Sequence, residues 1–375
     1  MRIGILTYDY VPAIGGLGIV AEQLERHLRK NFTANEYLVF SPSHGATETV
    51  SRLARWRWKK KGGCPMFSLS LFWTLPGMIK KRRIDVLHVH AGSGGVWLLR
   101  KPSVPLVVTA HHSYAQEAAS VYRGSPLAVA WKRLMAALEK RTYGYADHIT
   151  CVSADTRRVL IEVYGVPAAK VSVIENAVDL QKFTSDPAVV KNGKTVLFAG
   201  RLEPRKGIWV FVRAMGAIRK AVPGVRFRLI GQNLIGHKLR DVVRQQGLDS
   251  CCEFLGRVHE PFLIRELQDA DVVVVPSLIE GFGLIAAEAM ACGACVVASD
   301  CDGLRSLIDN RRTGMLFPTG DAEACATTVN HVLLDAGLRL RLAEAAGAEA
   351  HKRFSFTRQA ADMQASLERV WAAAK

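Results

Sequence analysis

The 375-residue sequence lacks the long apolar run that a membrane-spanning helix needs. Its longest apolar candidate, Phe67 to Ile79, is shorter than the ~18 residues required to cross a bilayer and contains Pro76-Gly77. The residues up to Asp9 also lack the basic, apolar and small-residue pattern of a secretory signal peptide. We therefore expect neither an integral membrane protein nor a secreted one, and the sequence favours a cytoplasmic location.

Cysteines are too sparse for a disulfide scaffold, since eight are scattered through a chain of this length. Cys292 and Cys295 form a C-x-x-C near Cys301, but no second pair stands at zinc-site spacing. Core packing is the favoured interpretation over a metal or redox site, and no metal is expected. The sequence also has no short repeat and no low-complexity tract, which excludes solenoids and disordered tails.

What is present is the composition of a folded globular protein, with 49% apolar and 22% charged residues, and a length that suits two domains. The net charge of +16 is uneven. Residues 1–180 hold 24 basic and 13 acidic residues, whereas residues 181–375 hold 26 and 21. We expect the N-terminal half to face an anionic partner or surface.

Apolar strand-like segments alternate with helical patterns along the whole chain, which predicts an α/β protein with parallel sheets built from βαβ units. A polar, irregular stretch from Asn176 to Lys194 is the candidate linker between two domains. The predicted strands are residues 2–7, 37–40, 86–90, 106–110, 148–152 and 171–175 before the linker, and 195–199, 226–230, 252–255, 272–276, 295–299 and 315–317 after it.

Two glycine-containing turns follow the first strand of each predicted domain. Gly15-Gly16-Leu17-Gly18 begins a helix, and free backbone N–H groups at a helix start can bind a phosphate, although such glycines can equally serve only the turn. The segment Gly200 to Gly207 holds Arg201, Arg205 and Lys206 at the carboxyl edge of its sheet. These cations can bind a diphosphate there, or they can belong to a solvated basic loop.

Two glutamates follow the apolar strand 272–276. Glu280 lies on a glycine turn, and Glu288 comes eight residues later on a helix whose alanines indicate that it is packed in. Carboxylates accept hydrogen bonds from sugar and ribose hydroxyls, and the N–H groups of Gly281, Phe282, Gly283 and Leu284 can meet phosphate or sugar oxygens. Two unrelated glutamates would be the alternative.

This run resembles the E-x7-E motif of the retaining glycosyltransferases of family 4, which have the GT-B fold of two Rossmann-like domains facing across a cleft. Further segments match the family in order along nearly the whole chain: Gly15-Gly16, Thr109-Ala110-His111, Ala146-Asp147, Val173 to Asp179, Gly200-Arg201 and Lys206-Gly207.

The resemblance implies a role for each matched position. Arg201 and Lys206 would hold the donor diphosphate and stabilise the departing charge, while Gly15 and Gly16 would approach the same phosphates. Glu280, with the amides after it, would hold the transferred sugar, Glu288 would bind the ribose, and the segment Gly256-Arg257-Val258 would meet the nucleobase. His111 would lie at the sugar near the reaction centre; without the resemblance it ranks no higher than His88, His90 or His112.

The family also implies retention of the anomeric configuration without a carboxylate nucleophile, with the leaving phosphate helping to deprotonate the acceptor. The donor would be a nucleotide diphosphate sugar, with UDP- and GDP-sugars favoured, and no cofactor or metal would be required. Three positions depart from the family pattern, namely Ser306 in place of a glutamate, Gly231-Gln232-Asn233 in place of G-x-G, and Ala177 in place of a glycine.

The stretch from Arg52 to Arg83 holds ten basic residues and no acidic one, interleaved with aromatic residues. Such a mixture suits peripheral contact with an anionic membrane at its inner face, whereas a solvated loop is the simpler alternative. Nucleic acid ranks below the membrane because no nucleic-acid-binding motif accompanies the stretch. A membrane contact would fit a lipid-linked or cell-envelope glycan as acceptor.

These features predict an N-terminal acceptor-binding domain over 1–178, a C-terminal nucleotide-sugar-binding domain over 192–352, and a last helix over 357–375 that crosses back to the first domain. Domain closure would complete the site. The expected function is a retaining hexosyltransferase. The alternatives are another GT-B enzyme, such as an inverting transferase or a sugar-nucleotide epimerase, and a non-catalytic two-domain ligand-binding protein.

Overall fold

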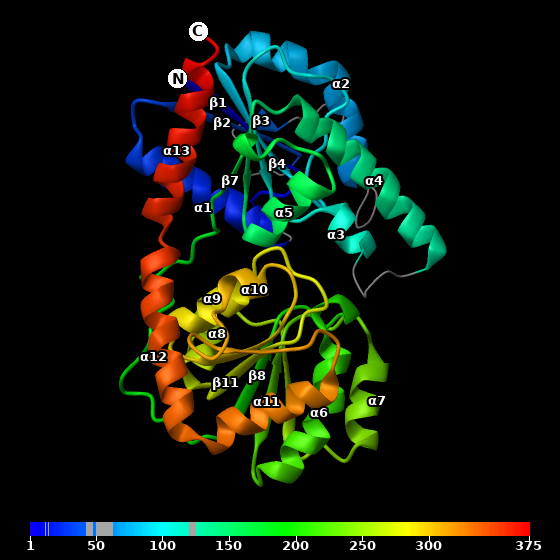
Figure 1. Ribbon diagram of the computed structural model, residues 1–375, viewed down its shortest axis with the longest axis vertical. Coiled ribbons are helices and arrows are strands. Elements are labelled where there is room, and N and C mark those ends of the chain that lie inside the picture. Colours follow the sequence, from blue (N-terminus) through cyan, green and yellow to red (C-terminus); the bar gives the residue numbers. More distant parts are fainter. Residues whose placement is uncertain (12, 14, 43–47, 50–62, 120–124) are drawn as a thin grey trace. The chain divides into compact units, whose positions relative to one another are not determined.

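The computed structural model of the protein describes residues 1–375 except 12, 14, 43–47, 50–62 and 120–124. The chain forms two compact units. The first draws on Met1–Ala119, Arg123–Ala177 and Phe356–Lys375, and the second on Val178–Ser355. Each unit is built around one parallel sheet with helices on both faces (Figure 1).

The first unit has a seven-stranded sheet in the order β3-β2-β1-β4-β5-β6-β7, and every pairing in it is parallel. Its central strands are buried on both faces because helices cover each side, so they read in sequence as continuous apolar runs. The strands are β1 (Arg2–Leu6), β2 (Glu36–Ser41), β3 (Glu48–Thr49), β4 (Val86–Ala91), β5 (Leu106–Ala110), β6 (His148–Cys151) and β7 (Val171–Val173).

Two groups of helices cover the faces of this sheet. Helices α1 (Gly16–Asn31) and α13 (Phe356–Ala372) pack against each other and share a core with Ile3, Ile5 and Val107. The opposite core contains residues of the helices α2 (Gly63–Arg82), α4 (Pro126–Tyr145) and α5 (Ala154–Glu162). The last helix of the chain is therefore part of the first unit. The short segments α3 (Tyr114–Ala119) and η1 (Ala168–Lys170) complete this unit.

The second unit has a six-stranded parallel sheet in the order β10-β9-β8-β11-β12-β13. Both sheets therefore have the doubly wound arrangement, in which the strand order reverses beside the first strand. The strands are β8 (Thr195–Ala199), β9 (Arg226–Ile230), β10 (Cys252–Gly256), β11 (Val272–Val275), β12 (Cys295–Ser299) and β13 (Met315–Phe317).

Helices of the second unit also lie on both faces of its sheet (Figure 1). A core of buried residues on one face includes side chains of α6, α7 and α11, while α8 and α9 cover the other. The bounds are η2 (Pro204–Lys206), α6 (Ile208–Ala221), α7 (His237–Gln245), α8 (Glu260–Asp269), α9 (Leu284–Ala291), α10 (Leu304–Leu307), α11 (Ala322–Leu334) and α12 (Ala336–Arg353). The predicted α/β class with two doubly wound parallel sheets is confirmed.

A solvated loop is one of the interpretations given above for the basic stretch from Arg52 to Arg83. It is wrong for residues 63–82, because they form α2, which packs Phe67, Leu71, Leu75 and Ile79 into the core of the first unit. The remainder, residues 52–62, lies outside the described residues. Among the helices of the described chain, none combines the length and apolar character that would let it span a membrane.

Candidate active site

The strand order of the second sheet brings two predicted loops together. Strand β8 pairs with β9 on one side and with β11 on the other, so the order reverses between β8 and β11. The loop after β8 carries Arg201 to Lys206, and the loop after β11 carries Pro276 to Gly283. Open α/β sheets bind their ligands at the carboxyl ends of the strands where the order reverses.

A close backbone approach joins these loops. Gly207 has a φ of 70°, and a Cβ atom there would lie 1.7 Å from the carbonyl oxygen of Pro276, so only glycine fits. The amide of Leu278 donates to the carbonyl of Arg205 at 2.9 Å. The basic loop is thus attached to the loop that carries Glu280.

Lys206 and Glu280 form an ion pair at this point. The Lys206 Nζ lies 2.5 Å from the Glu280 Oε2, and both side chains are mostly buried. The hydroxyl of Ser277 donates to the same carboxylate oxygen at 3.2 Å. Ser299 in turn donates its Oγ proton to the Ser277 carbonyl at 2.5 Å. The carboxylate is therefore held in one orientation by a cation and a hydroxyl.

Arg201 pairs within its own loop. Its Nη2 lies 3.0 Å from the Glu203 Oε1, and the Arg205 Nε lies 3.5 Å from the same oxygen. Half of the Arg201 side chain is exposed. The two loops together place three cations, Arg201, Arg205 and Lys206, beside two carboxylates, Glu203 and Glu280, which leaves one positive charge in excess. Such a cluster can accept an anion.

The glycine turn after Glu280 leads directly into α9. Gly281 and Gly283 are buried, and Gly283 stands at the helix N-cap with a φ of 99°, a conformation that suits glycine. Phe282 is buried with its ring edge-on to Phe354, at 5.5 Å between centroids. Leu284 is the first residue of α9. The turn therefore presents the N-terminal end of a helix beside the ion pair.

Glu288 lies on α9 and is half-buried. Burial raises its pKa to about 8, and the nearby Glu260 adds to the effect. Among the described residues, no group donates a hydrogen bond to its carboxyl oxygens. Arg257 and Val258 follow the edge strand β10, with Arg257 exposed and Val258 half-buried. Within the described chain, neither of them forms an ion pair or side-chain hydrogen bond with Lys206 or Glu280.

In the first unit, the predicted anion-binding turn is held by a carboxylate that the sequence reasoning overlooked. Asp9 is buried, and its Oδ2 accepts hydrogen bonds from the amides of Gly15 at 2.8 Å and Gly18 at 3.2 Å. A Cβ atom at Gly18 would lie 2.6 Å from this carboxyl group, so a side chain there would displace the Asp9 carboxylate from the turn. Gly16 begins α1 beside them. No sequence signal singles out Asp9, because it stands six residues before Gly15, the N-cap of α1, where the capping preference for aspartate does not apply.

His111 directly follows β5 and contacts a second histidine. The His90 Nδ1 lies 2.8 Å from the His111 Nε2, and the two rings stack with centroids 5.1 Å apart. Burial, with a contribution from His112, lowers the pKa of His111 to about 4. His111 is therefore neutral at pH 7, which suits a group that exchanges hydrogen bonds with hydroxyls.

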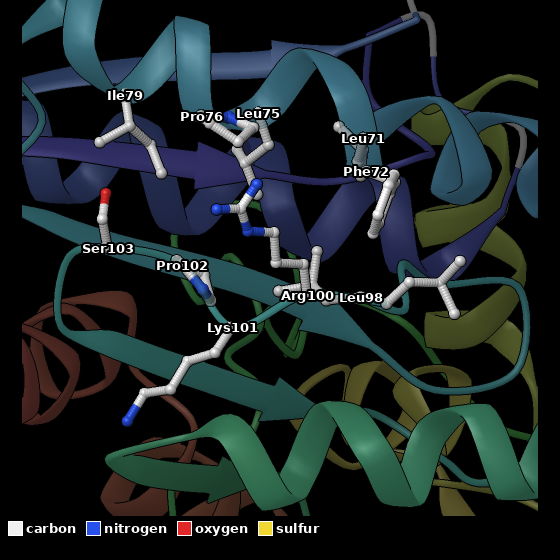
Figure 2. Close-up of a pocket in the computed structure, with 11 residues that line it drawn as sticks. Leu71, Phe72, Leu75, Pro76, Ile79, Leu98, Arg100, Lys101, Pro102 and Ser103 are labelled. Atoms are coloured by element: carbon white, nitrogen blue, oxygen red, sulfur yellow. The ribbon is translucent and has the colours of Figure 1, made fainter.

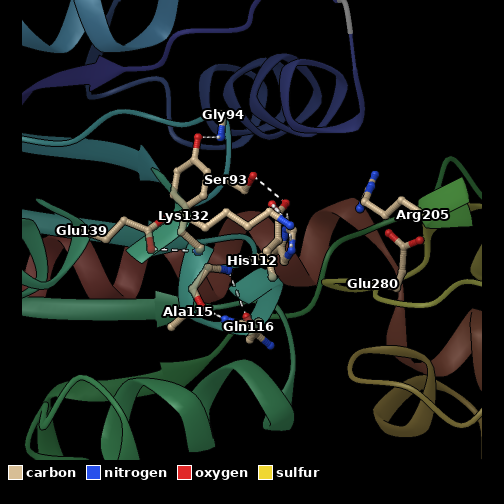
Figure 3. Close-up of polar contacts among 12 residues, drawn as sticks. Ser93, Gly94, His112, Ala115, Gln116, Lys132, Glu139, Arg205 and Glu280 are labelled. Carbon is tan, nitrogen blue, oxygen red and sulfur yellow. Dashed lines mark hydrogen bonds and ion pairs between the residues drawn. The ribbon is translucent and has the colours of Figure 1, made fainter. Parts of the chain in front are cut away.

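A polar cluster lies beside His111, on the segments after β4 and β5 and on α4. Glu117 accepts a hydrogen bond from the Ser93 hydroxyl at 2.7 Å, with the His112 Nε2 at 3.5 Å and the Lys132 Nζ at 3.8 Å. Figure 3 shows the side chains of Ser93, His112 and Lys132 pointing toward one another. The sequence did not predict this cluster, because α3 and α4 carry no motif that distinguishes Glu117 and Lys132 from ordinary residues on a helix surface.

A second carboxyl group of the first unit, that of Glu139, is fully buried. It accepts hydrogen bonds from the Tyr164 hydroxyl at 2.5 Å and from the Tyr114 amide at 3.0 Å. Figure 3 shows the position of the Glu139 side chain. Burial raises its pKa to about 8. The group is therefore largely protonated at neutral pH.

The C-x-x-C pair lies in the core of the second unit. Cys292 and Cys295 are buried free thiols, and burial raises the pKa of each to about 12. In the part of the chain that the structure describes, no group of histidine, cysteine or acidic side chains is arranged to bind a metal ion. These observations favour the core-packing interpretation of the pair.

Comparisons with known proteins place the chain in a family. The profile of Glycosyltransferase Family 4 matches residues 14–182, and the profile of Glycosyl transferases group 1 matches residues 193–335. The chain is 32% identical over 295 residues to the phosphatidyl-myo-inositol mannosyltransferase of Mycobacterium leprae, an alignment that covers 76% of this chain and 74% of the relative. The protein belongs to glycosyltransferase family 4. It is accordingly a glycosyltransferase.

Solved structures show the GT-B fold of this family 4 protein. The sucrose-phosphate synthase of Thermosynechococcus elongatus matches with a TM-score of 0.76 and 21% identity over 100% of both chains. The HepE protein of Anabaena, solved in complex with UDP and glucose, matches with a TM-score of 0.72 and 21% identity over 98% of this chain and 100% of that one.

The family 4 departure at Ser306 lies in α10. Ser306 is half-buried, and its carbonyl accepts a hydrogen bond from the Arg353 Nη2 at 3.0 Å. At a second departure, Gly231-Gln232-Asn233, the Asn233 side chain accepts hydrogen bonds from the amides of Ile235 and Gly236 at 2.9 and 3.0 Å, so it forms a local turn.

Proposed function

We propose that this family 4 glycosyltransferase moves a hexose from a nucleotide diphosphate sugar to an acceptor glycan or lipid-linked sugar, with retention of the anomeric configuration. The observation that carries the proposal is the Lys206–Glu280 pair at the point where the second sheet reverses its strand order, with Arg201 on the same loop. It combines a cation for the leaving group with a carboxylate for sugar hydroxyls.

The second unit binds the donor in this proposal. Lys206 and Arg201 hold the diphosphate, and the charge that develops on the leaving group is stabilised by cations already in place. Glu280 accepts hydrogen bonds from hydroxyls of the transferred sugar, and the amides from Gly281 to Leu284 add donors. The solved complex of HepE with UDP-glucose supports a donor of this class, since that protein shares the fold.

The remaining donor contacts involve the sugar ring and the nucleoside. Glu288 binds the ribose, and its carboxyl oxygens have no hydrogen-bond partner among the described residues to compete with the hydroxyls. The segment with Arg257 and Val258 meets the nucleobase. In the first unit, Gly15 and Gly16 belong to the proposed phosphate-binding turn, in which the amides of Gly15 and Gly18 already donate to Asp9.

The transfer breaks the bond between the anomeric carbon and the phosphate oxygen and forms a bond from that carbon to the acceptor oxygen on the same face. The acceptor proton passes to the leaving diphosphate. No carboxylate nucleophile is part of this route, because Glu280 is engaged by Lys206 and Ser277 and Glu288 binds the ribose. The cations neutralise the leaving group, so no metal ion is required.

A donor panel tests the proposal. The purified protein is incubated with UDP-, GDP-, ADP- and dTDP-sugars, with and without EDTA, and the release of nucleoside diphosphate is followed. We expect release from one donor class, unchanged by EDTA and abolished by Lys206→Ala and by Glu280→Ala. Lys220→Ala is the matched control, since Lys220 is an exposed lysine of the same unit. Release with none of the donors would overturn the proposal, and inversion in the product would overturn retention.

We also propose that α2 contacts an anionic membrane. Met66, Phe72 and Trp73 are exposed apolar side chains of this helix, and Lys80 and Lys81 are exposed at its end. Beside them is an apolar pocket formed by α2 and by residues 98–103, with Arg100 and Lys101 at its edge (Figure 2). Exposed aromatic side chains beside cations suit a lipid surface.

Vesicle flotation tests this contact. We expect binding to vesicles that contain phosphatidylglycerol and weak binding to phosphatidylcholine alone, with a loss on Trp73→Ser. The control is Trp371→Ser, because Trp371 is half-buried on α13 of the same unit. Equal binding to both vesicle types, or no effect of Trp73→Ser, would contradict the contact.

A further inference from the structure

Three histidines line up on one face of the first sheet. Side chains two residues apart on a strand share a face, which places His88 and His90 of β4 on one side. The register pairs His88 with Val107 and His90 with Thr109 of β5. His111 comes two residues after Thr109, so it follows on the same face of the sheet. The His88 and His90 rings lie 4.5 Å apart, and the His90 and His111 rings 5.1 Å apart.

The hydrogen bonds of these rings differ. The His88 Nε2 lies 2.7 Å from the Thr109 hydroxyl, which lies 2.7 Å from the Thr150 hydroxyl. The His90 Nδ1 lies 2.8 Å from the His111 Nε2. The His90 Nε2 is buried and has no hydrogen-bond partner in the described structure. His90 is therefore joined by one nitrogen to the predicted sugar-binding histidine and has no partner for the other.

All three rings are neutral at physiological pH. Burial lowers the pKa of His88 to about 3 and that of His90 well below its ordinary range, and the neighbouring histidines add to the effect. Among the described residues, no carboxylate bonds to any of the three rings, and the charged form of each would face the other imidazoles and His112. Each ring therefore carries one proton, on one of its two nitrogens.

Two proton arrangements satisfy the bond between His90 and His111. If His111 donates, the proton of His90 must sit on its buried Nε2, which leaves an N–H group without an acceptor. If His90 donates from Nδ1, its Nε2 is unprotonated and is an acceptor without a donor. The proton of His111 then sits on its own Nδ1. Buried donors without a partner are rarer in proteins than buried acceptors without one, which favours the second arrangement.

We infer that His90 is a positioning residue, which donates from Nδ1 to His111 and thereby holds His111 in the tautomer with its proton on Nδ1. His111 then presents a neutral N–H donor, and a sugar hydroxyl oxygen is the acceptor it fits. It does not remove the proton of the acceptor substrate. The inference rests on the proposed function for its second part, the contact with the sugar, while the tautomer itself does not depend on it.

Nitrogen-15 NMR of histidine-labelled protein tests the tautomer directly, because two-bond couplings distinguish a protonated from a bare ring nitrogen. We expect His111 to show a protonated Nδ1 and a bare Nε2 at pH 7. In His90→Phe, which keeps a ring but donates no hydrogen bond, we expect His111 to move toward the other tautomer. His90→Asn places an amide N–H near the position of Nδ1 and should restore the original pattern.

Kinetics with the donor found in the panel tests the role. His90→Phe should lower kcat/KM about ten-fold, which corresponds to the loss of one hydrogen bond that stabilises the transition state. His90→Asn should recover most of this loss. The control is His88→Phe, an equally buried histidine on the same face whose hydrogen bond goes to Thr109. Melting temperatures of the three variants separate a loss of folding from a loss of positioning.

The results test the tautomer of His111 and the positioning role of His90 separately. A protonated Nε2 on His111 in the wild-type protein, or an unchanged His111 pattern in His90→Phe, overturns the tautomer. An altered tautomer with unchanged kcat/KM, or an equal loss in His88→Phe, overturns the positioning role while the proposed transfer stands. No release from any donor by the wild-type protein overturns the contact with a sugar, and the NMR result still decides the tautomer.

Discussion

The two sheets of this protein share one strand order but differ in the chemistry at their carboxyl ends. In the second unit the strands β8 and β11 end in loops with three cations and two carboxylates, of which Lys206 and Glu280 form a close ion pair. In the first unit neutral histidines, His90 and His111, lie near the ends of β4 and β5, and a buried carboxylate holds the glycine turn after β1.

In the proposed function, this difference lets one topology serve two kinds of recognition. A strand-order reversal supplies a place where loops meet, and the residues on those loops decide which chemical group is bound. Paired charges with one cation in excess suit a diphosphate, whereas buried neutral imidazoles suit hydroxyls. The charged site is expected to be the more sensitive to a single substitution, because removal of one charge leaves its partner uncompensated.

The largest effect is expected for Lys206→Ala. Removing a cation placed for the leaving group should lower kcat by about 10²–10³-fold, the usual loss for one such electrostatic contact. The measurement is nucleoside diphosphate release with saturating donor, with Lys220→Ala as the control. A fall of less than about five-fold would show that the charged site does not stabilise the leaving group.

The next effect concerns the pH dependence of stability in both units. The carboxyl groups of Glu139, which is buried, and of Glu288, which is half-buried, have pKa values raised from 4.5 to about 8. The folded protein therefore binds these protons more tightly than the unfolded chain does, so the stability they contribute is full below pH 4.5 and is lost as the pH rises toward 8.

We expect the melting temperature to fall by several degrees between pH 5.5 and pH 8.5, and the fall to be smaller in Glu139→Gln and in Glu288→Gln. Glutamine keeps the size of the side chain but does not ionise. Scanning calorimetry at both pH values checks this. Glu162→Gln, at an exposed position on α5, is the control and should keep the wild-type fall. An identical pH dependence in all variants would mean that neither carboxyl group has a raised pKa.

A smaller effect is expected for Asp9→Ala. Asp9 caps the start of α1 through two amides, and the loss of such a cap costs about 1–2 kcal/mol of unfolding free energy. Chemical denaturation measures the change, with Glu162→Ala as the control that should stay within about 0.5 kcal/mol. If Asp9→Ala binds the donor nucleotide more tightly, the aspartate competes with phosphate for the turn; unchanged stability would contradict the cap.

The smallest effect is expected for Arg257→Ala. Arg257 is exposed after the edge strand β10, and its segment is proposed to meet the nucleobase through its backbone. We expect the KM for the donor to rise about two- to three-fold with kcat unchanged, since an exposed charge contributes little. Arg244→Ala, at an exposed position on α7, is the control. A rise above about 20-fold would show that this side chain itself binds the donor.

The strands were predictable because buried parallel strands are apolar along their whole length. Val272–Val275 and Leu106–Ala110 are buried at every position, and their apolar runs predict strands in the sequence. Helix α2 was not predicted. Its apolar residues lie on more than one side and Pro76 stands within it, so the sequence shows no clear helical stripe. Its apolar run was weighed only as too short for a membrane span.

Parts of the candidate site were also predictable from residue type and spacing. Lys206 and Glu280 stand out because each follows a strand and lies on a turn with glycine. Ser277, Asp9 and His90 do not stand out, because a serine, an aspartate or a histidine near a strand end is common and their importance comes from what they contact.

The sequence by itself determined the α/β class, the two series of strands and the loops that carry the charged residues. Apolar periodicity and turn residues are local properties of the chain, so they can be read without the fold. Only the tertiary structure decided that Lys206 meets Glu280, 74 residues later, and that His90 meets His111, 21 residues later. These contacts depend on which strands are neighbours in each sheet, and strand order is set by packing between segments far apart in the chain.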